Sequence, residues 1–516
     1  MDLAEGASGQ REEERAAGVA GTGPESLPEW EKDRLSKLER LREHHVEPYA
    51  RSFPDRDNPA EILRTYADLE PGSKDEESRC RVAGRVMARR EHGKAVFLTL
   101  RDGWDDIQVY SNVDTLGERS FELLTDVDVG DIVGCEGHIF RTRRGELTVF
   151  ASNWTLLTKS LRPLPEKWHG LQDRETRYRQ RYIDLVSNPD VAWQLRARGR
   201  IVSAMRRYLD SRGFVEVETP ILQPLPGGAL ARPFVTHHNA LDTDLYLRIA
   251  PELYLKRLLV GGFDRIYEIG KNFRNEGISL VHNPEFTMME LYWAYVDYNA
   301  IMELVENMIP ALAQDVLGAT EIVVGPHSID LSPPWPRRTV DSLLEEVLGL
   351  GLKHMRAAPE EAKRVLHQRG IEVENRDTFA TLVDKALKHA VWPGLVQPTF
   401  AIDYPLELSP LAKSSPNAPD IVERFQPIIA GKEMGNAFSE LNDPVDQRGR
   451  FEEQARNKEA GDEEAHVLDE DFLRALEYGM PPAGGLGIGI DRLAMMFLGA
   501  EGIRDVILFP QLRPEK

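Results

Sequence analysis

The stretch from Asp264 to Tyr295 constrains the fold more than any other part of the sequence. It predicts a strand, a loop and a second strand, because residues 275–283 hold a glycine and end before a proline. Side chains of a strand alternate between its two faces. One face of the second strand is therefore expected to carry Phe286, Met288, Glu290 and Tyr292. With Arg274 at the mouth of the loop, this face suits a pocket that stacks a base, holds a phosphate and receives a cation. A buried strand with charged edges is the simpler alternative.

Length and composition indicate a soluble protein of two or three domains, since 516 residues exceed one hydrophobic core. No apolar run approaches the ~20 residues that span a bilayer, and the acidic start lacks the pattern of a signal peptide. Two cysteines are too few for a disulfide framework. A cytoplasmic protein without a membrane segment is therefore expected. The net charge of −21 argues against a general nucleic-acid binder but allows a local basic face.

The N-terminal part of the chain predicts a tail, a helix and a small barrel. Residues 1–27 are rich in Gly, Ala and Glu without periodicity, which indicates a disordered acidic tail. A helical pattern follows and stops before Pro48. From Arg79 to Leu157 the hydrophobic period changes to two, and five short strands in about 80 residues suit a closed barrel of the oligonucleotide-binding type.

Basic residues gather in the barrel segment around Phe97. They are Arg79, Arg81, Arg85, Arg89, Arg90, Lys94 and Arg101. A basic groove with an exposed aromatic residue is how such barrels stack single-stranded bases. A solvated charged face, with Phe97 in the core, explains the segment equally well.

A linker at 161–190 separates the barrel from residues 191–516, where a further large domain is expected. A long helix near 191–212, ended by Gly213, leads into a strand that reaches Pro220. Such a unit serves as scaffold or as a self-complementary dimer surface. Residues 320–400 are expected to form a mostly helical insertion.

A glycine-rich segment, Gly484 to Arg492, lies near the C-terminus. Its spacing superficially matches a dinucleotide fingerprint, but the third glycine is missing and no βαβ unit precedes it. Glycines at a strand-to-helix turn, followed by an arginine on the first helical turn, instead admit a phosphate close to the backbone.

Several motifs together resemble the class II aminoacyl-tRNA synthetases. Motif one is matched by Gly213–Pro220, motif two by F-R-N-E-G at 273–277 and P-E-F-T-M-M-E at 284–290, and motif three by G-I-G-I-D-R at 487–492. Five further segments resemble the bacterial-type lysyl-tRNA synthetase family, namely P-G-G-A-x-A-R-P-F at 226–234, T-H-H-N-A-L-D at 236–242, A-P-E-L-Y-L-K at 250–256, S-P-L-A at 409–412 and F-S-E-L-N-D at 438–443. The resemblance covers residue 28 to the C-terminus.

This resemblance implies an α+β fold, in which a class II antiparallel β-sheet flanked by helices occupies 191–516. It also implies an N-terminal OB-fold barrel within 28–160 that reads an anticodon, and a homodimer. The reaction implied joins L-lysine to ATP, releases pyrophosphate, and passes the lysyl group to tRNA(Lys), with Mg²⁺ as cofactor. In-line attack between two anions needs positive charge more than a covalent nucleophile.

The resemblance also implies residue roles. Arg274 bridges the amino-acid carboxylate and the α-phosphate, and Arg492 lies on the ATP phosphates, so both are assigned as catalytic. The other implied ATP-binding residues are Glu276, His282, Phe286, Gly487 and Gly489, with Phe286 stacked on adenine. A lone histidine is more often structural, so the role of His282 depends on the match.

The implied lysine-binding residues are Gly228, Glu252, Glu290, Tyr292, Asn436, Phe438 and Glu440. Among them, Glu252 with the Gly228 backbone takes the α-amino group, and Glu440 with Tyr292 takes the ε-ammonium. Relatives that take aspartate would need a basic residue in the pocket, whereas Glu252, Glu290 and Glu440 are acidic. Carboxylates in a partly dry site are costly unless a cation pairs with them.

On the barrel, the resemblance assigns Phe97 to base stacking, and Gln108 and Glu146 to the edges of anticodon bases. Arg89 or Arg90 is assigned to the RNA backbone, because the register is ambiguous by one residue.

One position departs from the family pattern. The implied metal-binding residues are Glu433, Glu440 and Gln426, and the family usually has a glutamate where this chain has Gln426. An amide oxygen can bind a hard cation but lacks the charge. This departure, with the acidic tail, motivates an alternative function: a weakened paralogue that binds tRNA or regulates.

Overall fold

The computed structural model describes residues 27–103, 105–165, 171–229, 231–459 and 467–515. The predicted acidic tail lies outside the described residues, apart from its last position. The chain forms two compact units, Met1–Gln172 and Asp173–Lys516, each described by itself below. Within the described ranges, no helix is both long enough and apolar enough to cross a membrane.

The first unit is built around a closed five-stranded barrel with the strand order β1-β2-β3-β5-β4. The strands are β1 (Lys74–His92), β2 (Ala95–Arg101), β3 (Asp106–Asn112), β4 (Ile132–Arg141) and β5 (Leu147–Thr158). Inward-facing Val82, Leu98 and Val149 are almost fully buried. The helices of this unit are α2 (Glu29–Glu43), α3 (Pro59–Thr65), α4 (Val113–Leu116) and α5 (Glu118–Leu124). The predicted oligonucleotide-binding barrel is confirmed, because the period of two buries one side of each strand.

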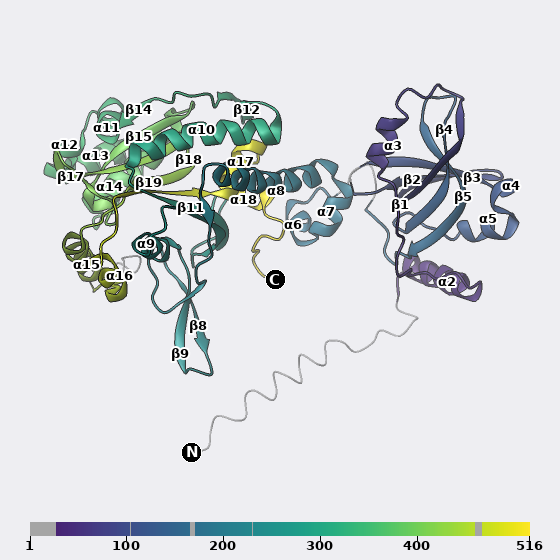
Figure 1. The fold of residues 1–516 in the computed structure, drawn as a ribbon, viewed down its shortest axis with the longest axis horizontal. Helices are drawn as coiled ribbons and strands as arrows, with labels where there is room; N and C mark the ends of the chain where they lie inside the picture. The colour runs from purple at the N-terminus through teal and green to yellow at the C-terminus, as the bar shows by residue number, and fades with distance from the viewer. Residues whose placement is uncertain (1–26, 104, 166–170, 230, 460–466, 516) are drawn as a thin grey trace, which may run out of the picture. The chain divides into compact units, whose positions relative to one another are not determined.

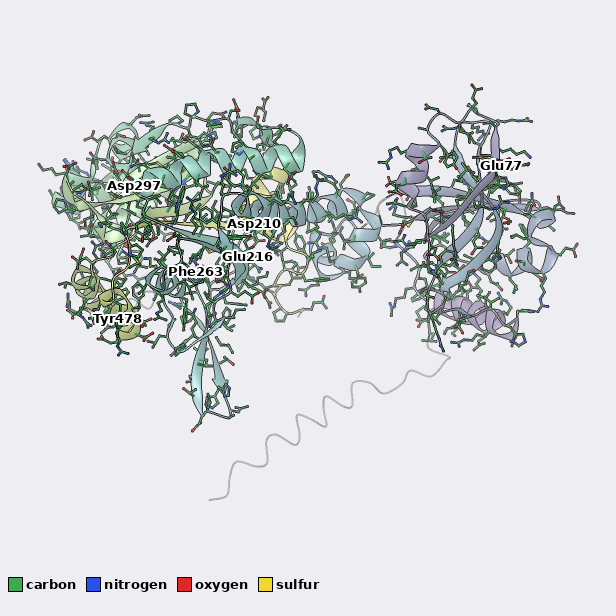
Figure 2. The ribbon with its side chains drawn as sticks, in the orientation of Figure 1. Glu77, Asp210, Glu216, Phe263, Asp297 and Tyr478 are labelled. Atoms are coloured by element: carbon green, nitrogen blue, oxygen red, sulfur yellow. The ribbon has the colours of Figure 1, made fainter. Side chains whose placement is uncertain are left out.

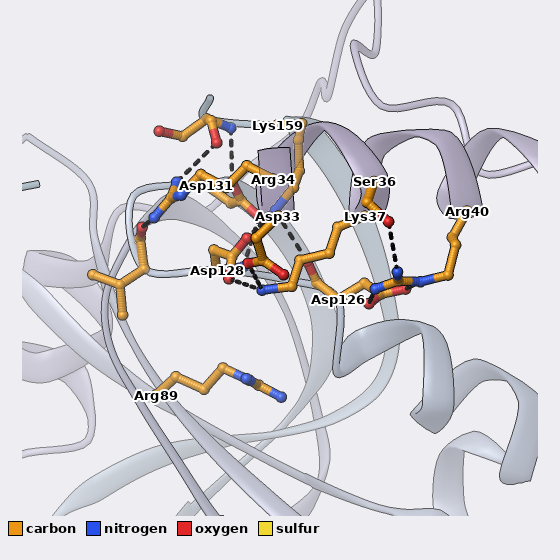
Figure 3. A network of polar contacts seen from close by, with 12 residues as sticks. Asp33, Arg34, Ser36, Lys37, Arg40, Arg89, Asp126, Asp128, Asp131 and Lys159 are labelled. Carbon is orange, nitrogen blue, oxygen red and sulfur yellow. Dashed lines mark hydrogen bonds and ion pairs between the residues drawn. The ribbon is translucent and has the colours of Figure 1, made fainter. Parts of the chain in front are cut away.

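A buried ionic network attaches α2 to the barrel (Figure 3). The Lys159 ammonium lies 2.6 Å from an Asp128 oxygen and 2.8 Å from an Asp131 oxygen, and its side chain is fully buried. Lys37 of α2 contacts the other Asp128 oxygen at 2.8 Å. Arg34, also of α2, donates to the carbonyls of Val129 and Ser160 at 2.8 Å. Each buried charge therefore has an opposite charge or a carbonyl as its partner.

The second unit contains a ten-stranded sheet whose main order is β14-β15-β17-β19-β20-β11-β10-β6. The bounds are β6 (Val215–Glu216), β10 (Arg265–Phe273), β11 (Glu285–Ala294), β14 (Arg337–Thr339), β15 (Thr399–Pro405), β16 (Ser414–Ser415), β17 (Ala418–Ile429), β18 (Lys432–Glu433), β19 (Gly435–Ser439) and β20 (Ala483–Gly489). Pairing is antiparallel except at β10–β6 and β14–β15. The expected antiparallel catalytic sheet is thereby confirmed.

Helices α8 (Pro189–Asp210), α10 (Tyr298–Leu317) and α17 (Ile490–Leu498) pack on this sheet. Figure 1 shows α8 and α10 as long neighbouring helices of the unit. Their apolar stripes form one core with the sheet, in which Ile201, Met205, Val305 and Ile309 have no exposed surface. This core holds β11 and β20 rigidly side by side, so that their other face can carry a site.

The helix–strand unit after α8 is fixed by polar contacts. Gly213 adopts φ 78°, a conformation that favours glycine, and turns the chain into β6. The Tyr267 hydroxyl donates to Asp210 at 2.7 Å, and Glu216 lies 3.4 Å away. Figure 2 labels Asp210 and Glu216 on the two elements that this tyrosine joins.

Residues 320–400 contain strands as well as helices. The helices are α11 (Val340–Leu348), α12 (Leu352–Ala357), α13 (Pro359–Gln368) and α14 (Phe379–Ala386). They are preceded by a hairpin of β12 (Glu321–Val324) and β13 (His327–Asp330), which the expectation of a mostly helical insertion did not include. The strands are only four residues long, too short for a visible alternation. Gly325 makes their turn at φ 58°.

Smaller elements surround the sheet. A second sheet has the order β7-β9-β8, from β7 (Leu222–Gln223), β8 (Phe234–His238) and β9 (Thr243–Leu247). Figure 1 shows the β8–β9 hairpin extending away from the main sheet. The remaining α-helices are α6 (Arg174–Arg179), α7 (Arg181–Ser187), α9 (Glu252–Val260), α15 (Pro444–Glu459), α16 (Glu470–Glu477) and α18 (Ile503–Val506).

Candidate active site

The main sheet carries a cavity of about 760 Å³ above β11, β19 and β20. Every residue that the sequence suggested for the lysine, ATP and metal sites lines it: Gly228, Glu252, Arg274, Glu276, His282, Phe286, Glu290, Tyr292, Gln426, Glu433, Asn436, Phe438, Glu440, Gly487, Gly489 and Arg492. They come from segments more than 200 positions apart, and the antiparallel register joins them. Glu290, for example, lies opposite Gly487, which lies opposite Asn436 on its other side.

One end of the cavity is acidic. Glu252 begins α9, and Glu440 follows β19; both are buried. The ammonium of Lys256 lies 2.7 Å from Glu252 Oε1 and 2.5 Å from Glu440 Oε2. Burial raises the pKa of Glu440, and Lys256 opposes that shift. Glu440 Oε1 has no hydrogen-bond partner within the described residues, so it remains available to a cation.

Glu290 and Tyr292 extend this acidic end along β11. The Tyr292 hydroxyl lies 3.4 Å from Glu290 Oε2, and both side chains are buried. Burial, with a smaller contribution from Glu252, raises the pKa of Glu290 to about 8. A bound ammonium would favour the ionised form, so this carboxyl is suited to respond to a cationic ligand.

Glycine at position 485 makes room for the Glu440 carboxylate. A Cβ at Gly485 would lie 1.9 Å from Glu440 Oε1 and 2.8 Å from the Tyr292 ring. Gly228, at φ 84°, is similarly close to Glu252, since its Cβ would lie 3.0 Å from the Glu252 Cβ. Any side chain at Gly485 would displace the charged end of the pocket.

The other end of the cavity is basic and aromatic. The Arg274 guanidinium lies over the Phe286 ring, 5.1 Å from its centroid. Burial lowers the pKa of Arg274, although nearby Glu276 and Glu290 oppose that shift. Arg492, on the first turn of α17, contacts His282 Nε2 at 3.4 Å. Burial and then Arg492 lower the pKa of His282, so the ring is neutral at pH 7.

Supporting contacts fix these groups. Arg424 donates to Asn436 Oδ1 at 2.7 Å and to the Leu408 carbonyl at 2.7 Å. Asp491, beside Arg492, accepts from the Thr287 backbone at 2.8 Å and from Arg198 of α8 at 2.7 Å. The start of α17 is thus tied to both β11 and α8.

The three residues suggested for a metal, Glu433, Glu440 and Gln426, all line this cavity. Among the described residues, no group of three or more His, Cys, Asp or Glu side chains could hold a metal ion. Gln426 Oε1 accepts a hydrogen bond from the buried Tyr404 hydroxyl at 2.7 Å, which uses one of its two lone pairs. Glu440 is engaged by Lys256. Glu433, half-buried on β18, is therefore the main carboxylate left for a cation that arrives with ligand phosphates.

In the first unit, Phe97 is half-buried and lies outside the barrel core, so the core alternative is wrong. It belongs to a row of residues that pair directly across all five strands: Arg90, Phe97, Tyr110, Phe150 and His138. Ring centroids of consecutive aromatic members are 4.8, 5.2 and 5.0 Å apart.

Arg89 and Arg90 differ in their surroundings on this face of the barrel. Arg90 is exposed opposite Phe97, whereas Arg89 pairs with Glu91. Gln108 donates to Thr148 at 3.3 Å, and the Thr148 hydroxyl donates to the Glu146 carbonyl at 3.2 Å.

Sequence reasoning missed several residues that shape these sites. They are Lys256, Tyr404, Arg424, Gly485 and Asp491 in the second unit, and Tyr110, His138 and Phe150 in the first. Alternation on β3 and β5 could have found Tyr110 and Phe150. The others depend on contacts between distant segments.

Comparisons with known proteins agree with this geometry. Residues 173–513 match the family described as tRNA synthetases class II (D, K and N), and residues 80–157 match the OB-fold nucleic acid binding domain. A lysine–tRNA ligase from Pelotomaculum thermopropionicum is 52% identical over 95% of this chain and 96% of the relative. One from Synechococcus is 51% identical over 95% and 100%, and one from Bacillus subtilis 48% over 93% and 96%.

Proposed function

Because this chain belongs to the class II tRNA synthetases of the D, K and N group, we propose that it is a lysine–tRNA ligase. It activates L-lysine with ATP, forms lysyl-adenylate and pyrophosphate, and transfers the lysyl group to the 3′ end of tRNA(Lys). The observation that carries this proposal is the acidic pocket beside the half-buried Arg274, in a chain about half identical to lysine–tRNA ligases over nearly its whole length.

In the activation step, the lysine carboxylate attacks the α-phosphorus of ATP, and the bond to pyrophosphate breaks. Arg274 faces both anions and lowers their repulsion, while Phe286 stacks on adenine beneath the same guanidinium. Arg492 and neutral His282 hold the phosphates, and Glu276 lies beside the nucleotide. Gly487 and Gly489 of β20 line the cavity without side chains, which leaves room for the nucleotide.

Lysine is selected by charge at both of its amino groups. Glu252 with Gly228 receives the α-amino group, and Glu440 with Tyr292 receives the ε-ammonium. Phe438 packs against the aliphatic stem, Glu290 adds negative charge, and Asn436 holds the carboxylate. An aspartate side chain would add a fourth carboxylate beside Glu252, Glu290 and Glu440, and a pocket with little water disfavours that.

Magnesium would bind together with the phosphates of ATP. Glu433 and the second lone pair of Gln426 suit a cation that keeps its waters and relies on substrate phosphates. Bound there, Mg²⁺ would neutralise phosphate charge during pyrophosphate release. Glu433 and Gln426 would orient that cation from β18 and β17.

The barrel recognises the anticodon of tRNA. Phe97 supplies a stacking surface that Tyr110 and Phe150 extend, Arg90 contacts the backbone, and Gln108 and Glu146 read base edges. The alternative of a tRNA-binding paralogue without activity gains no support from the comparisons.

The second unit also suits a cytoplasmic homodimer. Apolar side chains are exposed around the segment that resembles motif one: Val215 at 52%, Ile221 at 43%, Leu222 at 47% and Val235 at 60%. Clustered apolar exposure of this kind marks an interaction surface.

Aminoacylation assays test this function. Purified protein should attach labelled lysine, but not aspartate or asparagine, to tRNA in the presence of ATP and Mg²⁺. Charging with aspartate or asparagine at a comparable rate would refute the lysine assignment while leaving the family assignment intact.

A further inference from the structure

Lys256 is a buried cation behind the acidic wall of the cavity. Its side chain has no exposed surface, and it does not line the cavity itself. Its ammonium joins Glu252 and Glu440, and lies 5.4 Å from the centre of the Phe438 ring. All three of these partners line the cavity, so Lys256 touches the pocket only through other residues.

Stability alone does not explain such a residue. A buried lysine is costly to desolvate, and apolar residues of similar volume often stabilise a protein as well or better. Without Lys256, however, two buried carboxylates would face the same space with no fixed cation between them. Each could then rotate or take up a proton, and neither state receives an ammonium group well.

Among the described residues, Lys256 is the cation that acts on both Glu252 and Glu440. From β11, Glu290 and Tyr292 interact with the two carboxylates, and neither is cationic. Arg257, the next residue of α9, pairs instead with Asp469 at the start of α16. Lys256 forms its ion pair with Oε2 of Glu440, and both Glu440 oxygens are buried without a hydrogen-bond partner in the described part of the chain.

We propose that Lys256 is a positioning residue for lysine recognition: it bridges Glu252 and Glu440, and orients Oε1 of Glu440 toward the incoming ε-ammonium. This inference rests on the proposed lysine pocket. Lys256 thus holds the Glu252 and Glu440 carboxylates in place before the substrate lysine binds. The substrate therefore does not have to order these two carboxylates itself.

The test is steady-state ATP–pyrophosphate exchange with Lys256→Met, which keeps the volume and removes the charge. The KM for lysine should rise at least about tenfold, as expected when a buried ion pair loses one partner, while the KM for ATP changes less than about threefold. Arg257→Met is the matched control, because it breaks an ion pair on the same helix outside the cavity and should leave both KM values unchanged.

A second variant, Lys256→Ala, leaves a cavity that a small amine can fill. Propylammonium at millimolar concentration should restore part of the activity at subsaturating lysine in this variant, and should not activate the parent protein. Absence of rescue, together with an unchanged lysine KM in Lys256→Met, would overturn the inference. A fall in melting temperature with parallel rises in both KM values would equally overturn it, since Lys256 would then be purely structural.

Glu440→Gln separates this inference from the proposed pocket. If that variant raises the lysine KM and Lys256→Met does not, only the role of Lys256 fails. If neither variant changes the lysine KM, the assignment of the pocket itself fails.

Discussion

At the level of single residues, the proposed lysine recognition depends on a few buried carboxylate oxygens. We predict that Glu440→Gln weakens lysine binding by about 3–5 kcal/mol, because a buried ion pair loses one charged partner. Affinity for ATP should change little, since Arg274, Phe286 and Arg492 lie at the other end of the cavity. Exchange kinetics with each substrate varied in turn measure both effects. Equal losses for lysine and ATP would contradict the ε-ammonium assignment.

Position 426 gives a second prediction at this scale. Gln426→Glu should lower the half-saturating Mg²⁺ concentration, because the carboxylate adds charge and can still accept from Tyr404. The KM for lysine should stay the same. The measurement is a Mg²⁺ titration of lysine-dependent exchange on parent and variant, with Glu433→Gln as the opposite change. Superimposed parent and variant curves would mean that position 426 has no influence on the metal.

The positions of single residues in the fold were predictable where a local rule or a motif applied. Alternation along one strand was enough to place Phe286, Glu290 and Tyr292 on one face of β11. Lys256 was not predicted, because a glutamate and a lysine four residues apart resemble an ordinary ion pair on the surface of a helix. Only Glu440, 184 positions away, makes it a buried bridge.

At the level of elements, the barrel face provides the third prediction. Phe97→Ala should cost about 1–3 kcal/mol of tRNA binding, the usual value for one stacked base, and leave ATP–pyrophosphate exchange unchanged. Tyr49→Ala is a suitable control, since Tyr49 is an exposed aromatic residue of the same unit outside the row. A parallel fall of exchange and tRNA binding would indicate a structural role for Phe97.

The buried network beneath α2 provides the fourth prediction. Lys159→Met should destabilise the first unit by about 3–5 kcal/mol, because Asp131 and Asp128 lose their shared cation. Hydrogen exchange of the barrel amides measures the effect, with the sheet of the second unit as internal control. Unchanged protection of the barrel would show that Lys159 adds nothing to its stability.

The same network predicts a direction with pH. Burial alone would raise the pKa of Asp128, but its bonds to Lys159 and Lys37 outweigh burial and lower it. A depressed pKa in the folded state gives stability that is complete above the unfolded value and is lost as pH falls through the folded value. Barrel protection should therefore decrease in acid, and less steeply in Lys159→Met.

Strands could be predicted from the alternation of apolar residues where they were long enough to show it. The barrel strands and the β10–β11 hairpin were visible in the sequence, because each has seven or more residues. The four-residue strands β12 and β13 were not, since so short a run has no measurable period.

At the level of the whole molecule, the exposed apolar side chains near β6 and β7 lead to the fifth prediction. Sedimentation equilibrium should give twice the chain mass for the parent protein, and Leu222→Glu should shift it toward the single chain, because a charge at an apolar interface is costly. Tyr478→Glu is the control, since Tyr478 is 82% exposed elsewhere on the same unit. A monomeric parent protein would contradict the dimer.

The central claim is that this cavity activates lysine, and lysine-dependent ATP–pyrophosphate exchange tests it most directly. Purified protein, labelled pyrophosphate, ATP and Mg²⁺ are incubated with each of the twenty amino acids in the absence of tRNA. The structure predicts exchange with lysine that far exceeds exchange with aspartate or asparagine, because the pocket presents Glu252, Glu290 and Glu440. No exchange with lysine at any Mg²⁺ concentration, or stronger exchange with an acidic amino acid, would contradict it.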